Sequence, residues 1–276
     1  MYKLKEWVQQ DKLDWEMLSR NPKAIRILEQ NQDKIDWTEL SSNPEAAELL
    51  EKNLDKVCWY SISKNPGAIS ILKKNTDKVC MHALCSNPHP ESIKILEKHQ
   101  DYITWWALSS NPAAIHFLEK NLDRVSWSDL CLNPAAIHIL EANPEKIKWL
   151  FLSKNPAAMH ILEKNVEQIS WSNLSEMPEA IRILEANLDK VNWFSLSENP
   201  AAIHLLQENP DKIDWSHLYF NPEGIQILEN SKDKIRWDAI SFNQGIFEYD
   251  YANMTRPFKD ELLAVIYHPD NISRLF

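Results

Sequence analysis

The chain has 276 residues, 44% of them hydrophobic, and its 40 acidic and 30 basic side chains give a formal net charge of −10. This acidic balance argues against nucleic acid or an anionic membrane surface as a partner, because both require clustered Lys and Arg. The N-terminus has no apolar segment typical of a secretion signal, and no stretch is long enough to span a bilayer. With only four Cys, we expect a protein of a reducing compartment that is neither secreted nor inserted in a membrane.

A motif of 22 residues recurs eleven times and is marked by Trp in every unit except the fourth. The marker residues are Trp15, Trp37, Trp59, Met81, Trp105, Trp127, Trp149, Trp171, Trp193, Trp215 and Trp237, with one step of 24 residues after Met81. A fixed period of this length indicates a solenoid whose units stack only on their neighbours. We therefore predict an all-α fold, an α-solenoid of about eleven helix-turn-helix repeats over residues 14–243.

The N-terminal residues 1–13 look like an incomplete unit. They contain Leu4, Trp7, Val8 and Leu13, which are apolar and available to cover the first repeat. Terminal repeats of solenoids are commonly altered to close the stack. We expect this segment to be an N-terminal cap.

Each unit begins with a short helix at the marker residue. The residue before it is often a helix-capping type, namely Asp14, Asp36, Thr104, Ser126, Ser170, Asn192 or Asp214. Trp and the Leu three positions later lie on one side of such a helix. The Ser that follows this Leu, as at Ser41 and Ser109, is small enough for close packing between units.

An Asn-Pro pair then begins a longer helix, because Asn is a strong N-cap and Pro suits the first helical position. Its apolar residues, as in Ile115 and Leu118, share one face, and a second Asn such as Asn121 follows as a left-handed C-cap. Because packed helices lie roughly 8–10 Å apart, eleven such units predict a rod or arc on the order of 100 Å long.

The fourth unit is irregular, since it lacks the Trp and carries the two-residue insertion. Its Cys80, His82 and Cys85 resemble zinc ligands, but on a helix they point in different directions. Cys85 also occupies the usual Ser position, so packing can explain it. We expect no metal or cofactor here, and we interpret the insertion as a bend or weak joint in the stack.

One position of the longer helix carries His in four units and Arg in a fifth. We call this set the histidine ridge; it comprises His116, His138, His160, Arg182 and His204. The helical period places the ridge on the outer face, where successive rings are too far apart to share one Zn²⁺. Two interpretations stay open: ordinary solvated His, or a ridge that becomes basic below about pH 6.5 and alters contact with an acidic partner.

The residue after each marker does not repeat, and we call this set the variable row. It comprises Glu16, Thr38, Tyr60, His82, Trp106, Ser128, Leu150, Ser172, Phe194, Ser216 and Asp238. Large apolar groups alternate with small or polar ones, and Leu132, Phe151 and Phe220 add to the same side. Either the row packs within a tightly curved inner face, or it is open to solvent. In the second case we predict Tyr60, Trp106, Leu150, Phe151 and Phe194 as partner-binding residues.

The pattern ends at Asn243-Gln244, where Gln replaces Pro. Residues 244–276 contain the segment Gly245–Tyr251, then a predicted helix from Pro257 to about Tyr267 and a final turn after Pro269. Apolar residues of that helix, among them Phe258 and Leu262, could pack on the last repeat. We expect a C-terminal cap.

The repeated text from Leu108 to Trp127, together with Gly245–Tyr251, Glu261-Leu262-Leu263 and His268-Pro269, resembles tandem-repeat proteins of large nucleocytoplasmic DNA viruses of protists. The resemblance covers nearly the whole chain. It implies a virus-encoded protein that acts in the host cytoplasm or in the virion. That family has no assigned catalytic residues, so the resemblance implies no site.

The chain contains no phosphate-binding loop, nucleophile elbow or zinc-protease motif, and it has only three Gly. Its acidic residues are distributed by the repeat, which is typical of a solvated surface. We therefore predict a non-enzymatic scaffold that binds a protein or peptide along an extended helical face. The alternatives are an architectural virion or assembly component, which would self-associate, and a metal-binding or hydrolytic protein, for which the sequence supplies no pocket.

Overall fold

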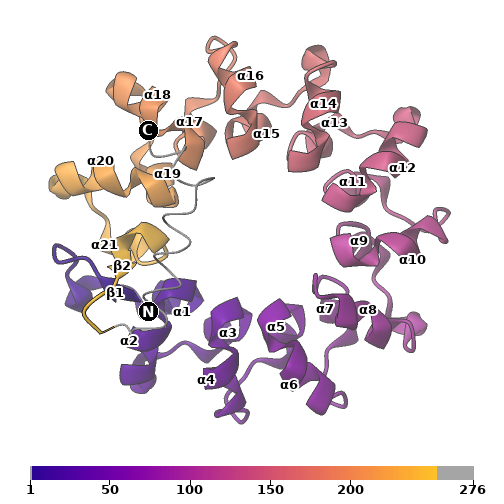
Figure 1. Cartoon of the computed structure of the whole chain (residues 1–276), viewed down its shortest axis with the longest axis horizontal. Helices are drawn as coiled ribbons and strands as arrows, with labels where there is room; N and C mark the ends of the chain where they lie inside the picture. Colours follow the sequence, from indigo (N-terminus) through magenta and orange to yellow (C-terminus); the bar gives the residue numbers. More distant parts are fainter. Residues whose placement is uncertain (1, 254–276) are drawn as a thin grey trace.

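The computed structural model describes residues 2–253, which form an α-helical solenoid closed into a ring (Figure 1). The helices that begin at the marker residues lie on the inner side: α1 (Trp15–Arg20), α3 (Trp37–Ser42), α5 (Trp59–Lys64), α7 (Met81–Leu84), α9 (Trp105–Ser109), α11 (Trp127–Leu130), α13 (Trp149–Leu152), α15 (Trp171–Ser175), α17 (Trp193–Leu196), α19 (Trp215–Leu218) and α21 (Trp237–Ile240). The helices that follow the Asn-Pro pairs lie on the outer side: α2 (Ile25–Gln30), α4 (Ala47–Glu51), α6 (Ile69–Lys74), α8 (Pro90–Leu96), α10 (Ile115–Glu119), α12 (Ile137–Ala142), α14 (Met159–Leu162), α16 (Ile181–Glu185), α18 (Ile203–Glu208) and α20 (Ile225–Asn230). The prediction of an all-α repeat solenoid is confirmed.

The Asn-Pro pair begins the outer element through a short 3-10 turn. In unit one, the Asn21 side chain accepts a hydrogen bond from the backbone N–H of Lys23, and η2 (Pro22–Ala24) leads into α2. At the inner helices the capping prediction is right for Asp14, Asp36, Asn192 and Asp214 and wrong for Thr104, Ser126 and Ser170, whose side chains make no capping bond.

The prediction of left-handed C-caps is wrong. No residue described has a positive φ, and the residue after α2, Asn31, has a φ of −136°. Its side-chain amide instead donates to the carbonyl of Ile27 at 2.9 Å. The Asn therefore satisfies a helix-end carbonyl with its side chain rather than by a left-handed backbone.

The core runs between the inner and outer helices of every unit. Leu40 of α3 and Leu50 of α4 are both fully buried, and equivalent positions in the other units are buried in the same way. The Trp rings are partly buried at the edge of this core. The Lys three positions before a marker residue covers the Trp of the preceding unit in several cases, for example Lys56, whose Nζ lies 4.7 Å from the ring centroid of Trp37.

Two sets of side chains bind neighbouring units to each other. Asn133 donates to the carbonyls of Ser109 and Asn111 in the preceding unit, at 3.0 Å each. Ser109 donates to the carbonyl of Trp105 at 2.7 Å, and its hydroxyl accepts the backbone N–H of Ser126 in the next unit at 3.0 Å. The small Ser thus forms a hydrogen-bonded link as well as allowing the close packing that we predicted.

The same links also close the ring, because unit one packs on unit eleven in the way that every other unit packs on the preceding one. The backbone N–H of Asp14 donates to Ser241 Oγ at 2.8 Å, and Asn21 donates to the carbonyls of Ser241 and Asn243 at 3.3 Å each. The expectation of an open rod or arc is therefore wrong. The repeat period gives the number of units but not the rotation between them, which is about one eleventh of a turn.

The two ends of the described chain complete unit eleven together. After α21, η17 (Gln244–Ile246) leads into β2 (Phe247–Tyr249), which pairs antiparallel with β1 (Tyr2–Leu4) where the other units have an outer helix. Val8 and Leu13 are buried, and Trp7 contacts Trp237. Residues 2–13 and 244–253 thus meet each other at the junction. The predicted helix of 257–267 and the terminal motifs of the resemblance lie outside the described residues.

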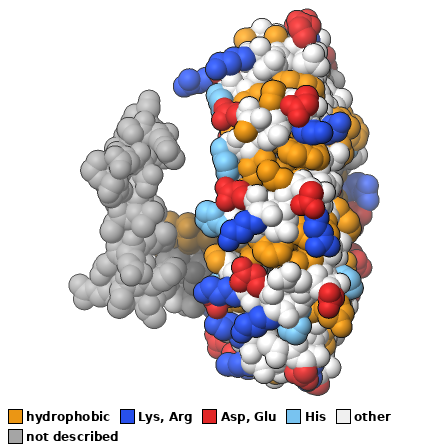
Figure 2. Space-filling view, turned by 90° about the vertical axis from the view of Figure 1, so that its right-hand side faces the viewer, with side chains coloured by type: hydrophobic (Ala, Val, Ile, Leu, Met, Phe, Trp, Pro, Cys, Tyr) orange, Lys and Arg blue, Asp and Glu red, His pale blue; other side chains and the backbone are white. Residues whose placement is uncertain are grey.

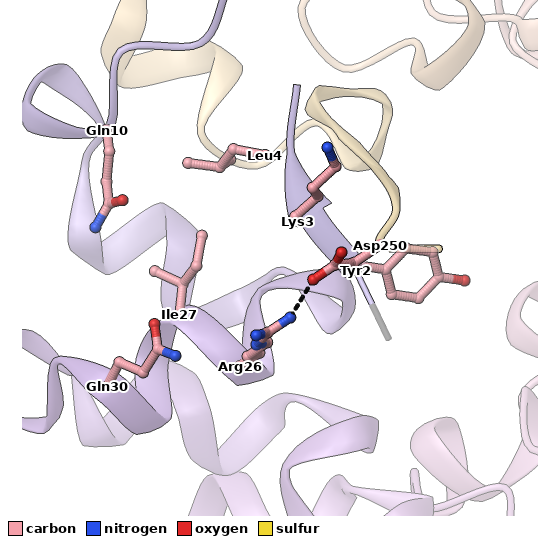
Figure 3. Close-up of a pocket in the computed structure, with 8 residues that line it drawn as sticks. All are labelled: Tyr2, Lys3, Leu4, Gln10, Arg26, Ile27, Gln30 and Asp250. Atoms are coloured by element: carbon pink, nitrogen blue, oxygen red, sulfur yellow. Dashed lines mark hydrogen bonds and ion pairs between the residues drawn. The ribbon is translucent and has the colours of Figure 1, made fainter. Parts of the chain in front are cut away.

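Figure 3 shows the outer side of this junction, where β1, α2 and the residue after β2 line a pocket of about 210 Å³. Arg26 of α2 forms an ion pair with Asp250. Hydrogen bonds from Asn253 and Arg26 lower the pKa of the Asp250 carboxyl. Lys3 of β1 pairs with Glu248 of β2 at 3.1 Å. The two strands are therefore joined by an ion pair between side chains as well as by backbone hydrogen bonds.

Candidate interaction surface

The variable row lies on the inner helices and is open to solvent. Its four large apolar members are more than half exposed: Tyr60 (55%) on α5, Trp106 (63%) on α9, Leu150 (58%) on α13 and Phe194 (54%) on α17. At 100° per residue, the marker and the Leu three positions later face the core, whereas the next residue after the marker is turned away from it. Phe151, the fifth predicted contact residue, is only partly exposed and packs against the core.

Charged side chains accompany the row. Lys64 Nζ lies 4.2 Å from the ring centroid of Tyr60. The ring of Phe194 lies against the imidazole of His217, whose nitrogens face Asp214 at 2.8 Å and Glu198 at 3.6 Å. Burial raises the pKa of the Glu198 carboxyl. Charged side chains of both signs thus flank the apolar members of the row.

The apolar surface continues beyond the row toward the ring junction. Phe220, which follows the last residue of α19 by two positions, is 44% exposed, and its ring centroid lies 6.3 Å from that of Phe242. Phe242 occupies the same position in unit eleven, after α21. Sequence reasoning placed Phe220 on this side but missed Phe242, although the same offset from the marker could have found it.

The histidine ridge lies on the outer helices, and all its members are exposed. In the edge-on view of Figure 2, His side chains follow one rim of the ring with acidic groups beside them. His138, His160 and His204 each approach a Glu of the preceding unit, at 2.8, 2.9 and 2.8 Å. Each of these three imidazoles therefore faces a carboxylate of the neighbouring unit, and the ridge that becomes basic on acidification stays a prediction.

Glu119 has two His neighbours, His116 at 3.2 Å and His138 at 2.8 Å. Hydrogen bonds from His138 and His116 lower the pKa of the Glu119 carboxyl. Among residues 2–253, however, no group of three or more His, Cys, Asp and Glu has an arrangement that could hold a metal ion. Three ridge members, His138, His160 and His204, thus contact a Glu of the preceding unit, whereas His116 contacts Glu119 of its own helix.

The irregular fourth unit does not interrupt the stack. Asn111 donates across it to the carbonyls of Cys85 and Asn87 at 2.9 and 2.8 Å, and Cys85 Sγ accepts the backbone N–H of Thr104 at 3.3 Å. The two extra residues are accommodated before α8, where the hydroxyl of Ser92 donates to the carbonyls of Asn87 and His89. The expected disturbance of the stacking is therefore wrong, and Cys85 replaces Ser as a link.

The comparisons with known proteins give no relative. No family model, no curated protein and no solved structure matches the chain. Within the described part of the chain, no helix has the length and apolar character that crossing a membrane requires.

Proposed function

We propose that this protein is a non-enzymatic scaffold, a closed ring whose inner helices bind a protein or peptide partner. The observation that carries the proposal is the exposure of Tyr60, Trp106, Leu150 and Phe194 at one equivalent position of four inner helices. Large apolar side chains in water favour association, and aromatic residues are enriched where partners dock. The repeat fixes the helices that carry them, so their spacing is rigid.

The charge of the chain limits the partner's chemistry. A formal net charge of −10 repels acidic surfaces and attracts basic ones, whereas a neutral partner meets no net repulsion. We therefore propose a neutral or basic partner, and neither nucleic acid nor a membrane surface. From the resemblance we further infer a virus-encoded protein that works in the host cytoplasm or the virion.

The architectural alternative would need contacts between copies of the chain. An open solenoid can extend end to end, but here unit one covers unit eleven through the hydrogen bonds of Asp14 and Asn21. Extension through the ends of the stack is therefore disfavoured, and association of rings would have to use their sides. A molecular mass that does not change with concentration, measured by light scattering, would favour the scaffold over the assembly component.

The test is capture of a partner from infected host cells by a triple variant with Tyr60, Trp106 and Phe194 changed to Ser. A matched control changes Leu122 and Leu188 to Ser, since these are exposed apolar residues outside the inner helices. We expect the wild type and the control to retain a discrete partner that the triple variant loses by at least about ten-fold, as truncation of central apolar anchors does. Equal recovery by all three baits, at unchanged helical content and melting, would refute the proposal.

A further inference from the structure

Ring closure creates a second pocket, of about 340 Å³ and on the inner helices. Unit ten contributes His217 and Phe220, unit eleven contributes Asp238 and Ala239, and unit one contributes Asp14 and Met17. Because Asp14 and Met17 precede Asp238 by more than 200 residues in the sequence, the pocket exists only when the two ends of the solenoid meet. We call it the closure pocket.

Unit ten differs from the others at the wall of this pocket. Tyr219 stands where the other ten units have Ser or Cys, and it is buried. Its hydroxyl donates to the carbonyl of Lys234 in the turn before α21. Units ten and eleven are therefore joined through an aromatic ring where the other junctions use a small side chain.

The lining of the closure pocket combines an apolar surface with carboxylates. Met17, Phe220 and Ala239 provide apolar contact area, and none of the three is fully buried. Asp14 uses one carboxylate oxygen to cap α1, through the backbone N–H of Met17. Asp238 pairs with Arg236, another lining residue, at 2.5 Å. Two carboxylates and one guanidinium leave the pocket with a net negative charge.

This lining fits a chain of methylene groups that ends in a cation, which is the chemistry of Lys and Arg side chains. A volume of about 340 Å³ is at the small end of ligand sites, so it suits one side chain better than a cofactor. The closure pocket also adjoins the variable row, since His217 lines the pocket and contacts Phe194. A segment bound along the row would therefore bring a neighbouring side chain to the pocket.

We propose that the closure pocket receives an Arg or Lys side chain of the partner whose apolar residues bind the variable row. The proposal rests on the proposed function and specifies the partner as a peptide segment that carries a basic residue beside aromatic or aliphatic ones. Since both ends of the stack form the pocket, the bound side chain also holds the ring closed.

The test uses calorimetry with three probes: the tetrapeptide acetyl-Leu-Phe-Arg-Phe-amide, the same peptide with neutral citrulline in place of Arg, and agmatine, a small dication that carries a guanidinium and an ammonium group. We expect the Arg peptide to bind the full chain about five-fold more tightly than the citrulline peptide, which corresponds to one exposed ion pair. Agmatine should bind more weakly than the peptide, because it lacks the apolar contacts. Equal affinity of the two peptides would overturn the proposal, and agmatine binding as tightly as the Arg peptide would show a site for free amines instead.

Two variants locate the effect. Asp238→Asn should abolish the preference for Arg over citrulline, whereas Glu16→Gln, at an exposed carboxylate of the variable row outside the pocket lining, should keep it. Both positions are exposed, so unchanged melting is the check on folding. Loss of preference in Glu16→Gln alone would overturn the assignment. If the triple row variant loses the partner but Asp238→Asn still captures it, the closure-pocket proposal is refuted and the proposed function stands. If both variants still capture the partner, the closure-pocket proposal and the proposed function are both refuted.

Discussion

The Asn of each Asn-Pro pair has two functions, and the sequence indicates only one of them. The preference of Asn for N-caps predicts the bond from its side-chain oxygen, as in Asn133, which accepts the backbone N–H of Ala135 at 3.0 Å. The side-chain NH₂ instead bonds two carbonyls of the preceding unit. That link depends on how two units stack, which no pattern within one unit specifies. Because the amide is buried, water cannot supply these hydrogen bonds, and the two carbonyls accept from the NH₂ group instead.

Replacing Asn133 by Leu should lower the free energy of unfolding by about 3 kcal/mol, since three hydrogen bonds are lost and two buried carbonyls lose a donor. Unit eight provides the control, because Met177 stands at the equivalent position and its side chain makes no capping bond. Met177→Leu should cost less than about 1.5 kcal/mol, as volume-conserving apolar exchanges do. Urea denaturation of both variants measures the difference. Similar losses would show that the position acts through packing rather than through hydrogen bonds.

At the scale of the element, the helices are too short to be stable alone. The inner helices span four to six residues, far fewer than an isolated helix needs in water. Their order and start points could be predicted because marker residues and Asn-Pro pairs recur. The second Asn also predicted where outer helices such as α2 and α12 end. The backbone geometry of those ends could not be predicted, since Asn caps them through its side chain. The two-residue insertion was also misjudged, because a loop between elements can lengthen without moving the helices.

Glu91 of α8 joins two outer helices after that insertion. It pairs with Lys94 in its own helix and with Lys73 of α6 at 3.0 Å. Hydrogen bonds from Lys94 and Lys73 lower the pKa of the Glu91 carboxyl to about 2. Since this is below the ordinary Glu pKa of about 4.3 in an unfolded chain, its contribution to stability is complete above that pH and disappears as the pH falls toward 2.

The Glu91→Gln variant should therefore be less stable than the wild type at pH 6, and the difference should shrink between about pH 4.3 and 2. Denaturant unfolding across this range measures the difference, with Glu97→Gln as a control in the residue after α8. An NMR titration of the Glu91 carboxyl checks the pKa directly. A difference that stays constant down to pH 2 would contradict the ion-pair assignment.

At the scale of the whole molecule, closure of the ring depends on the angle of rotation between neighbouring units. Eleven units, the helix pairs and the apolar members of the variable row could all be predicted, because each depends on positions inside one unit. Closure could not, because a small change in rotation accumulates over eleven steps and separates the ends. Only the structure reveals that β1 pairs with β2 and that the closure pocket forms, since both combine residues from opposite ends of the described chain.

A disulfide across the junction tests closure directly. Tyr2 and Tyr249 are opposite each other in the β1–β2 register, and their ring centroids lie 4.9 Å apart. Opposing residues of an antiparallel pair have Cα atoms roughly 4.5–5.5 Å apart, which a disulfide can bridge. We expect Tyr2→Cys/Tyr249→Cys, with the four native Cys changed to Ser, to form an intramolecular bond under mild oxidation. By restricting the unfolded chain, that bond should raise the free energy of unfolding by up to about 4 kcal/mol.

The control for this disulfide is Tyr2→Cys/Leu122→Cys in the same background. Leu122 is exposed and follows α10, which lies across the ring from β1 (Figure 1). The linked monomer should migrate faster than the reduced one on a non-reducing denaturing gel, and only for the Tyr2/Tyr249 pair. If both pairs reacted equally, or if the junction pair formed only dimers, the chain would be an open arc. The closure pocket would then have no unit one to complete it, whereas the exposed row of the inner helices would remain available to a partner.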